Sequence, residues 1–144
     1  MINYDIIIVM ATRNNSYNVG NIPPQVAWTI VRGDTASFKV FVTDDAKQAI
    51  VLDEWTINMK VKRPNSQEDL GVITDNATTV LDLLPAPDAD DAIGEFTVFL
   101  TAAQSQTLET GDIFDIQLST STTDPQIVWT VAQGSITVIE DVTD

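Results

Sequence analysis

Apolar and polar residues alternate along much of this chain. The clearest run, EWTINMKVKRP, puts Trp55, Ile57, Met59 and Val61 on one face and polar residues on the other. Period-two alternation over five or more residues is typical of a β-strand with one buried face. The other runs of this kind predict further core positions, namely Phe38, Val40, Val42, Phe96, Val98, Leu100, Phe114, Ile116, Leu118, Ile127, Trp129, Val131, Ile136 and Val138.

Turn-forming residues separate the runs, and two further stretches, QVAWTIVRG and TTVLDLLP, are weaker strand candidates. Strand candidates recur about every 8–20 residues with no sustained helical period, which predicts a β-sandwich of about seven to nine strands. The exception is TAAQSQTLETG, where Thr101 is suited to cap a helix of one or two turns and Gly111 to end it. The turn segments are RGDT, KRPNSQEDLG, PAPDADDAIG, TSTTDPQ and AQGS.

The amino-terminal segment MINYDIIIVMATRNN contains an apolar run, Ile6–Ala11. The run is too short for a membrane span, and no positive charge precedes it as in a secretion signal. We therefore expect a strand or an arm here. The predicted organisation is an amino-terminal arm or strand extension over residues 1–30 and a β-sandwich domain over residues 31–144.

Composition fits one globular domain and argues against catalysis. The chain has 144 residues, 44% of them hydrophobic, and contains neither histidine nor cysteine. This excludes Ser-His-Asp and Cys-His hydrolases and any zinc-thiolate site. No phosphate-binding loop or dinucleotide fingerprint occurs among the six glycines. We therefore expect no enzymatic activity, no catalytic residues and no cofactor.

The acidic residues include candidates for metal ligands and for catalytic pairs. The cluster PDADDAIGE holds four acids, but its spacing does not match a calcium-binding EF-hand loop, so a solvated loop is the preferred interpretation. No metal site is predicted, although calcium binding near Asp88–Glu95 stays an open alternative. Asp112 and Asp115 are three positions apart on a strand and should face opposite ways, so they do not suit a glycosidase pair.

Charge is strongly segregated along the sequence. The net charge is −14, all seven basic residues lie within the first 63 positions, and residues 64–144 contain acids but no base. Such a chain repels nucleic acids and anionic lipids, so we expect neither as a partner. The acidic half is either a solubilising surface or a face that docks a basic neighbour. Lys60, Lys62 and Arg63 form a basic spot that is too small for a nucleic-acid groove.

Outward aromatic residues suggest a contact surface. Phe41 and Phe99 interrupt the polar faces of their strands. Together with the amino-terminal apolar run they predict an interface, with a second buried layer inside the fold as the alternative. Trp55 and Trp129 fall on apolar faces and are expected in the core, whereas the placement of Trp28 is left open. The candidate interface residues are Ile6, Ile7, Ile8, Val9, Phe41 and Phe99.

The order of motifs resembles that of small bacteriophage structural proteins. There, GDT leads into an alternating strand and a lysine-bearing strand, as in RGDTASFKVFVTDDAKQAIVLDEWTINMKVKRPNS. The ending GEFTVFLTAAQSQTLETGDIFDIQLS, followed by TVAQGSITVIEDVT, is similar to theirs as well. The resemblance runs from about Arg32 to Thr143. It departs from the family at VLDEWT, where a leucine-threonine-glycine turn is usual, and in the residues ahead of RGDT.

This resemblance implies an immunoglobulin-like, antiparallel, all-β sandwich with one short helical turn and an amino-terminal arm. It looks like the domains of phage tail and baseplate components, including the amino-terminal domain of baseplate upper proteins. The implied function is a virion structural protein, made in the host cytoplasm, that serves as a tail, baseplate or fibre-attachment subunit. Its implied partners are other virion proteins and further copies of itself. The alternatives are a capsid decoration protein and, from another class, a carbohydrate-binding module.

Overall fold

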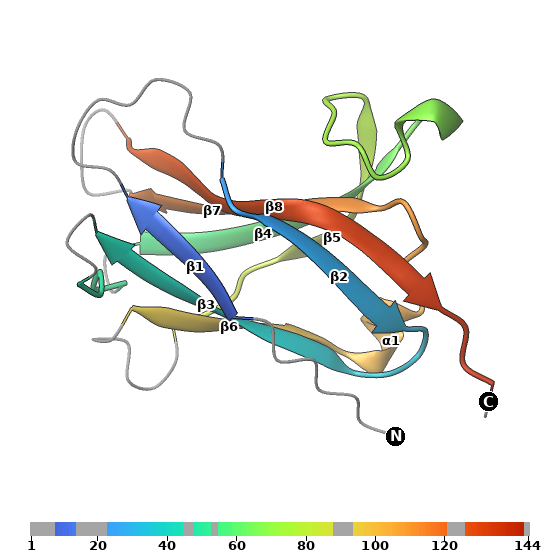
Figure 1. Cartoon of the computed structure of the whole chain (residues 1–144), viewed down its shortest axis with the longest axis horizontal. Coiled ribbons are helices and arrows are strands. Elements are labelled where there is room, and N and C mark those ends of the chain that lie inside the picture. The colour runs from blue at the N-terminus through green and yellow to red at the C-terminus, as the bar shows by residue number, and fades with distance from the viewer. Residues whose placement is uncertain are drawn as a thin grey trace.

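A computed structural model of the chain describes residues 8–13, 23–44, 48–52, 55–87, 94–120 and 126–142. These residues form eight strands, one single-turn α-helix and one 3₁₀ turn. The strands lie in two sheets that pack face to face (Figure 1). The predicted all-β sandwich with one short helical turn is confirmed.

The first sheet has three strands in the order β1-β3-β6. Strand β3 is central, and it pairs antiparallel with β6 from Ala36↔Leu100 to Phe41↔Glu95. An isolated bridge joins Pro87 to Phe96 on the other side of β6. The three strands are β1 (Ile8–Arg13), β3 (Ala36–Asp44) and β6 (Glu95–Leu100).

The second sheet has five strands in the order β2-β8-β7-β4-β5. Strands β4 and β7 pair antiparallel over eight residues, from Trp55↔Thr120 to Lys62↔Ile113. The weaker candidates QVAWTIVRG and TTVLDLLP form β2 and β5. The strands are β2 (Gln25–Val31), β4 (Trp55–Pro64), β5 (Ala77–Leu83), β7 (Ile113–Thr120) and β8 (Val128–Ile139).

The two strands nearest the amino terminus pair in parallel, unlike the rest of the sandwich. Strand β1 lies parallel to β3, and β2 lies parallel to β8. Each is the outer strand of a different sheet, so the chain passes from one sheet to the other between residues 13 and 25. The antiparallel prediction therefore holds for the other strand pairs. The division at residue 30 stays a prediction, although β2 contributes side chains to the common core.

The alternating pattern predicts most of the core. The inward positions of β3, β4, β6 and β7 are buried as expected, apart from Trp55, which is half-buried. Trp28, whose place was open, is 1% exposed and is the largest fully buried side chain. Its ring packs edge-on against Phe38 of the facing sheet, with centroids 4.7 Å apart, and against Phe114 at 6.3 Å. Because the contact with Phe38 crosses between the sheets, Trp28 joins the two layers, whereas Phe114 lies in the same sheet as Trp28.

The segments QIVWTVAQG and SITVIED join in one continuous strand, Val128–Ile139, so the turn predicted at AQGS is wrong. The core position predicted at Ile127 is also wrong, since Ile127 lies just before this strand and is 37% exposed. The register of β8 against β7 shifts between Ile116 and Gln117. Val131 and Ala132, which are adjacent, are both buried. A β-bulge produces this pattern because one extra residue reverses which side chains face inward. The inward positions consequently change from odd numbers, such as Val131, to even numbers, such as Ile136.

A one-turn helix, α1 (Ala102–Ser105), connects β6 to β7. The predicted cap is confirmed, since the Thr101 hydroxyl accepts from the Gln104 backbone N–H and the Gln104 side chain accepts from the Thr101 N–H. Such a reciprocal arrangement satisfies two backbone donors at the helix start. The helix ends before Gly111, so the predicted role of Gly111 as its stop is wrong. Gly111 instead has φ 99° in the turn before β7.

The connection between β4 and β5 folds back over the outer side of the five-stranded sheet. It contains the 3₁₀ turn η1 (Gln67–Asp69) and returns toward the β7 side. The Gly71 backbone N–H donates to the Gly111 carbonyl oxygen at 2.7 Å. This connection covers Ile113, whose side chain points away from the core and is nevertheless 4% exposed.

Candidate interaction surface

The predicted interface residues do not form one cluster among the described parts of the chain. Ile6 and Ile7 lie outside the described residues. For Ile8 and Val9 the structure gives the backbone only, which pairs with Lys39 and Val40 of β3. Their role in an interface stays a prediction.

The two outward aromatic residues lie at different places on the three-stranded sheet. Phe41 is half-buried and is in register with Glu95, whereas Phe99 is in register with Ser37, at the other end of the β3–β6 ladder. Phe99 is 49% exposed and lies beside Leu84, which is 71% exposed, at a shallow groove. Phe99 is therefore an exposed apolar position.

The candidate calcium loop falls largely outside the described residues. Of its acids only Glu95 is described, and its Oε1 lies 3.3 Å from the Lys39 Nζ. Within the described ranges, no group of three acidic side chains gathers closely enough to hold a metal ion.

The charges that are segregated in sequence are paired in space. Three basic residues from the first half form ion pairs with acids from the second half, which joins distant parts of the chain. The acidic half is therefore partly neutralised within the molecule. The pairs are Arg32 Nε with Glu140 Oε2 at 3.0 Å, Lys39 Nζ with Glu95 Oε1 at 3.3 Å, and Arg63 Nε with Asp112 Oδ1 at 2.9 Å.

The Arg63–Asp112 pair is the most buried of these contacts. Asp112 is fully buried, and its Oδ2 accepts from Arg63 Nη2 at 3.0 Å and from the Glu109 backbone N–H at 2.9 Å. The hydrogen bond to Asp112 raises the pKa of the Arg63 guanidinium above its ordinary value. Arg63 is thus engaged with Asp112 and does not add to a basic spot with Lys60 and Lys62. Asp112 and Asp115 face different neighbours, so they do not form a catalytic pair.

Two arginines hold the corner that follows α1. Arg63 Nη2 donates to the Thr107 carbonyl oxygen at 2.9 Å. Arg32 Nη1 donates to the carbonyl oxygens of Gln106 and Leu108, at 3.0 and 2.8 Å. Three successive carbonyl groups of this corner therefore accept hydrogen bonds from arginine side chains. These hydrogen bonds fix the corner to β4 through Arg63 and to the β2–β3 turn through Arg32.

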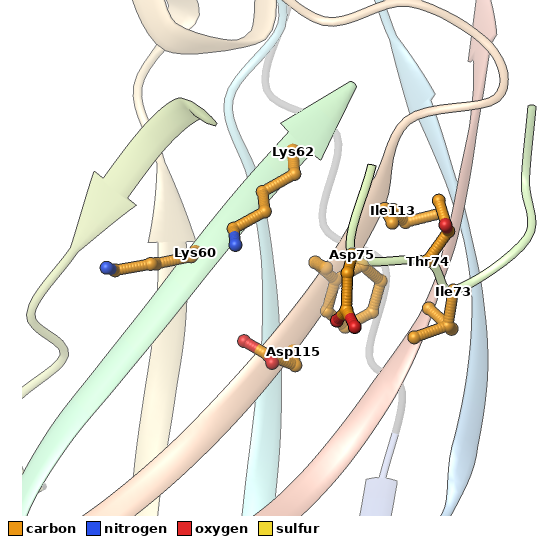
Figure 2. Close-up of a pocket in the computed structure, with 8 residues that line it drawn as sticks. Lys60, Lys62, Ile73, Thr74, Asp75, Ile113 and Asp115 are labelled. Atoms are coloured by element: carbon orange, nitrogen blue, oxygen red, sulfur yellow. The ribbon is translucent and has the colours of Figure 1, made fainter. Parts of the chain in front are cut away.

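A small hollow lies on the outer side of the five-stranded sheet, and we call it the β4–β7 hollow. Its volume is about 90 Å³, and Figure 2 shows the residues that line it. Lys60 and Lys62 extend from β4, Asp115 from β7, and Thr74 and Asp75 come from the β4–β5 connection. Its remaining lining residues are Ile73, Ile113 and Phe114.

Burial is the main influence on Asp115. It raises the pKa of the Asp115 carboxyl above 3.8, while Lys62 and Lys60 lower it by charge attraction. In the described part of the chain, the Asp115 carboxylate makes no hydrogen bond or ion pair, and neither lysine has an acidic oxygen within 4.0 Å. The hollow therefore presents charged groups of both signs that are not directly paired with one another.

The β4–β5 connection carries exposed apolar side chains, of which Ile73 lines the hollow. Leu70, Val72 and Ile73 are 39%, 52% and 43% exposed. Sequence reasoning placed Lys60 and Lys62 outward but missed this site. The site depends on a polar connection folding across the sheet, and the apolar triplet Leu70, Val72 and Ile73 in NSQEDLGVITD was the signal that could have indicated it.

No helix in the described ranges has the length and apolar character needed to cross a membrane.

No protein family matches the sequence, and no curated protein matches it. Among solved structures, the N-terminal domain of phage TP901-1 ORF48 is similar, with a TM-score of 0.51 and 7% sequence identity. The match covers 91% of this chain and 97% of that domain. At such low identity the likeness is one of fold, and it extends over nearly the full length of both chains.

Proposed function

We propose that this chain is a structural protein of a bacteriophage virion and acts by binding neighbouring proteins in the particle. The observation that carries the proposal is the shared fold with a domain of a phage protein over 91% of this chain. Because one fold can serve several functions, the likeness in fold must be supported by a second observation before it can carry a function. The order of sequence motifs from Arg32 to Thr143, which resembles phage structural proteins, supplies it.

An immunoglobulin-like topology is the finer description that we propose. In variable-type immunoglobulin domains, one sheet contains strands G, F, C and C′, and the other contains B and E. The orders β8-β7-β4-β5 and β3-β6 agree with this arrangement when β3 to β8 are assigned to B, C, C′, E, F and G. The chain lacks the cysteines that link strands B and F in antibody domains.

Within the virion we propose a position in the tail, the baseplate or a fibre attachment, following the sequence resemblance. The test is to purify particles of the encoding phage, separate tails from heads, and quantify the chain in each fraction by mass spectrometry. Low copy number in the tail fraction supports the proposal. High copy number on heads would instead identify a capsid decoration protein, and absence from particles would refute the virion role.

The amino-terminal segment is proposed to contact a neighbouring subunit. Deleting residues 1–24 removes β1 but retains all of β2, which begins at Gln25. We expect the shortened chain to fold, because Trp28 and its contacts remain, and to fail to assemble into particles. Normal assembly of this variant would show that the segment makes no essential contact.

We also propose that the chain is not an enzyme and that it self-associates within the particle. The absence of histidine and cysteine supports the first statement. Sedimentation velocity over a range of concentrations tests the second, and a monomer at every concentration would oppose self-association outside the particle.

A further inference from the structure

The β4–β7 hollow has balanced charge. Two lysines, Lys60 and Lys62, and two aspartates, Asp75 and Asp115, line it. Lys62 and Asp115 come from neighbouring strands and extend toward the same space (Figure 2). A ligand in the hollow therefore meets hydrogen-bond donors and acceptors together.

Balanced charge selects against charged ligands. An anion would gain from the lysines and be repelled by Asp115 and Asp75, and a cation would meet the reverse. A neutral group that both donates and accepts hydrogen bonds, such as a carboxamide, can bind the lysines and the aspartates at the same time. Each of its hydrogen bonds would involve a charged partner, which makes them stronger than bonds between neutral groups.

The size of the hollow agrees with such a group. Cavities of about 150 Å³ admit a six-carbon ring such as benzene. The hollow of about 90 Å³ is thus suited to three or four heavy atoms, the size of a carboxamide head group.

The surroundings favour a polypeptide over a sugar as the source of that group. Sugars are generally held against exposed aromatic rings, whereas the only aromatic lining residue, Phe114, is 2% exposed. Ile73 lines the hollow, and Leu70 and Val72 on the same connection are also exposed, so this connection offers apolar surface that suits the side chains next to an asparagine or glutamine.

We propose that the β4–β7 hollow binds the carboxamide of an asparagine or glutamine side chain from a partner protein, with Asp115 accepting from its NH₂ group and Lys62 donating to its oxygen. The raised pKa of Asp115 fits this role, because a hydrogen-bond donor would stabilise a carboxylate that burial destabilises. This inference deepens the proposed structural role by naming the chemistry of one partner contact.

Acetamide, acetate and acetamidinium provide matched probes, because they have the same shape and differ in charge. The full chain, labelled with ¹⁵N, is titrated with each probe, and the amide shifts of Thr74, Ile113 and Asp115 report binding. We expect acetamide to bind more tightly than either charged probe. Asp115→Ala and Lys62→Ala should each weaken acetamide binding about tenfold, the loss expected for a hydrogen bond to a charged group.

The two variants give a pattern of signs that separates the alternatives. For acetamide both variants weaken binding. If the hollow takes anions, Asp115→Ala strengthens binding and Lys62→Ala weakens it, and if it takes cations the effects are reversed. Thr56→Ala, an exposed change on the same strand, is the control and should leave every affinity unchanged.

Four results would overturn the proposal. They are tighter binding of acetate, of acetamidinium or of methyl glucoside, and no response of the hollow to acetamide. None of these results would affect incorporation of the chain into particles, so this inference and the proposed virion role fail separately.

Discussion

Arg63 connects β4, the strand next to the edge of the five-stranded sheet, to a corner of the fold. It binds a fully buried carboxylate, Asp112, and the Thr107 carbonyl group, while its own side chain remains 34% exposed. A buried ion pair adds little net stability by itself, but removing one partner leaves the other charge buried and unpaired. The contribution of this corner to the stability of the fold therefore depends on both Arg63 and Asp112 being present.

Arg63→Ala should lower the free energy of unfolding by about 3 kcal/mol, the lower end of the range for breaking a buried pair. Urea denaturation followed by tryptophan fluorescence measures the change. Lys60→Ala removes an exposed cation from the same strand and should change stability by less than about 0.5 kcal/mol.

The cause of that loss can be checked with Arg63→Ala combined with Asp112→Asn. The second substitution removes the charge but keeps an oxygen that accepts from the Glu109 N–H. The double variant should be more stable than Arg63→Ala alone, since no unpaired charge remains buried. A double variant that is less stable than the single one would contradict this explanation.

Asp115 should make stability depend on pH in the opposite direction from a typical ion-paired aspartate. Its pKa is raised in the folded chain, so the folded state holds the proton more readily than the unfolded state does. The free energy of unfolding therefore decreases as pH rises through the pKa that the Asp115 carboxyl has in the folded state. Asp115→Asn should be more stable than the natural chain at pH 7, and the difference should disappear below the ordinary pKa of 3.8. Urea midpoints of both proteins across this pH range provide the test.

Strand β8 shows where alternation predicts structure and where it misleads. Alternation correctly predicts strand in both halves, although Ile127, expected in the core, is exposed, and the segment AQGS between them suggests a turn. The bulge at Val131 explains the change without breaking the strand. Gly134, which looked like a turn residue, lies where β2 approaches closely, and a Cβ atom there would overlap the Val26 carbonyl oxygen.

Gly134→Ala should therefore destabilise the fold by about 1–3 kcal/mol or more, as overpacked substitutions do. The overlap involves backbone of β2, which cannot move aside without disturbing the parallel β2–β8 ladder. Thermal unfolding measures the loss, with Gln133→Ala, a half-buried neighbour, as the control. If Gly134→Ala and Gln133→Ala have the same melting temperature, the close approach is not a constraint.

Strand existence could be predicted because inward side chains repeat every second residue, as in Phe96, Val98 and Leu100. Which strands pair with one another could not be predicted, because pairing uses backbone groups that are alike in all residues. The parallel placement of β1 and β2 is one example. The β4–β7 hollow is another, because the fold of the β4–β5 connection depends on contacts such as that of Gly71 with Gly111.

The two sheets share one apolar core, and one aromatic cluster within it bridges them. Trp28 of β2 contacts Phe38 in the opposite sheet and Phe114 in its own. Trp129 and Trp55 also meet edge-on, at 6.4 Å, but both are only half-buried. The three tryptophans should therefore contribute unequally to the free energy of unfolding.

Trp28→Ala should cost about 3–5 kcal/mol of stability, as expected for a large aromatic removed from a packed core. Trp129→Ala is a matched control, since it removes the same side chain from a half-buried place, and its cost should be clearly smaller. Guanidinium denaturation followed by circular dichroism compares them. Equal losses would mean that Trp28 has no special role between the sheets.

The parallel pairing of β2 with β8 has a consequence for how the chain is made. Gln25 is in register with Gln133, and Val31 with Ile139, so an early strand finds its partner only after most of the polypeptide has left the ribosome. Contacts between residues so distant in sequence slow folding. Until β8 has been synthesised, the apolar side of β2, which includes Trp28, has no sheet to join. We therefore expect a stalled nascent chain to need a chaperone.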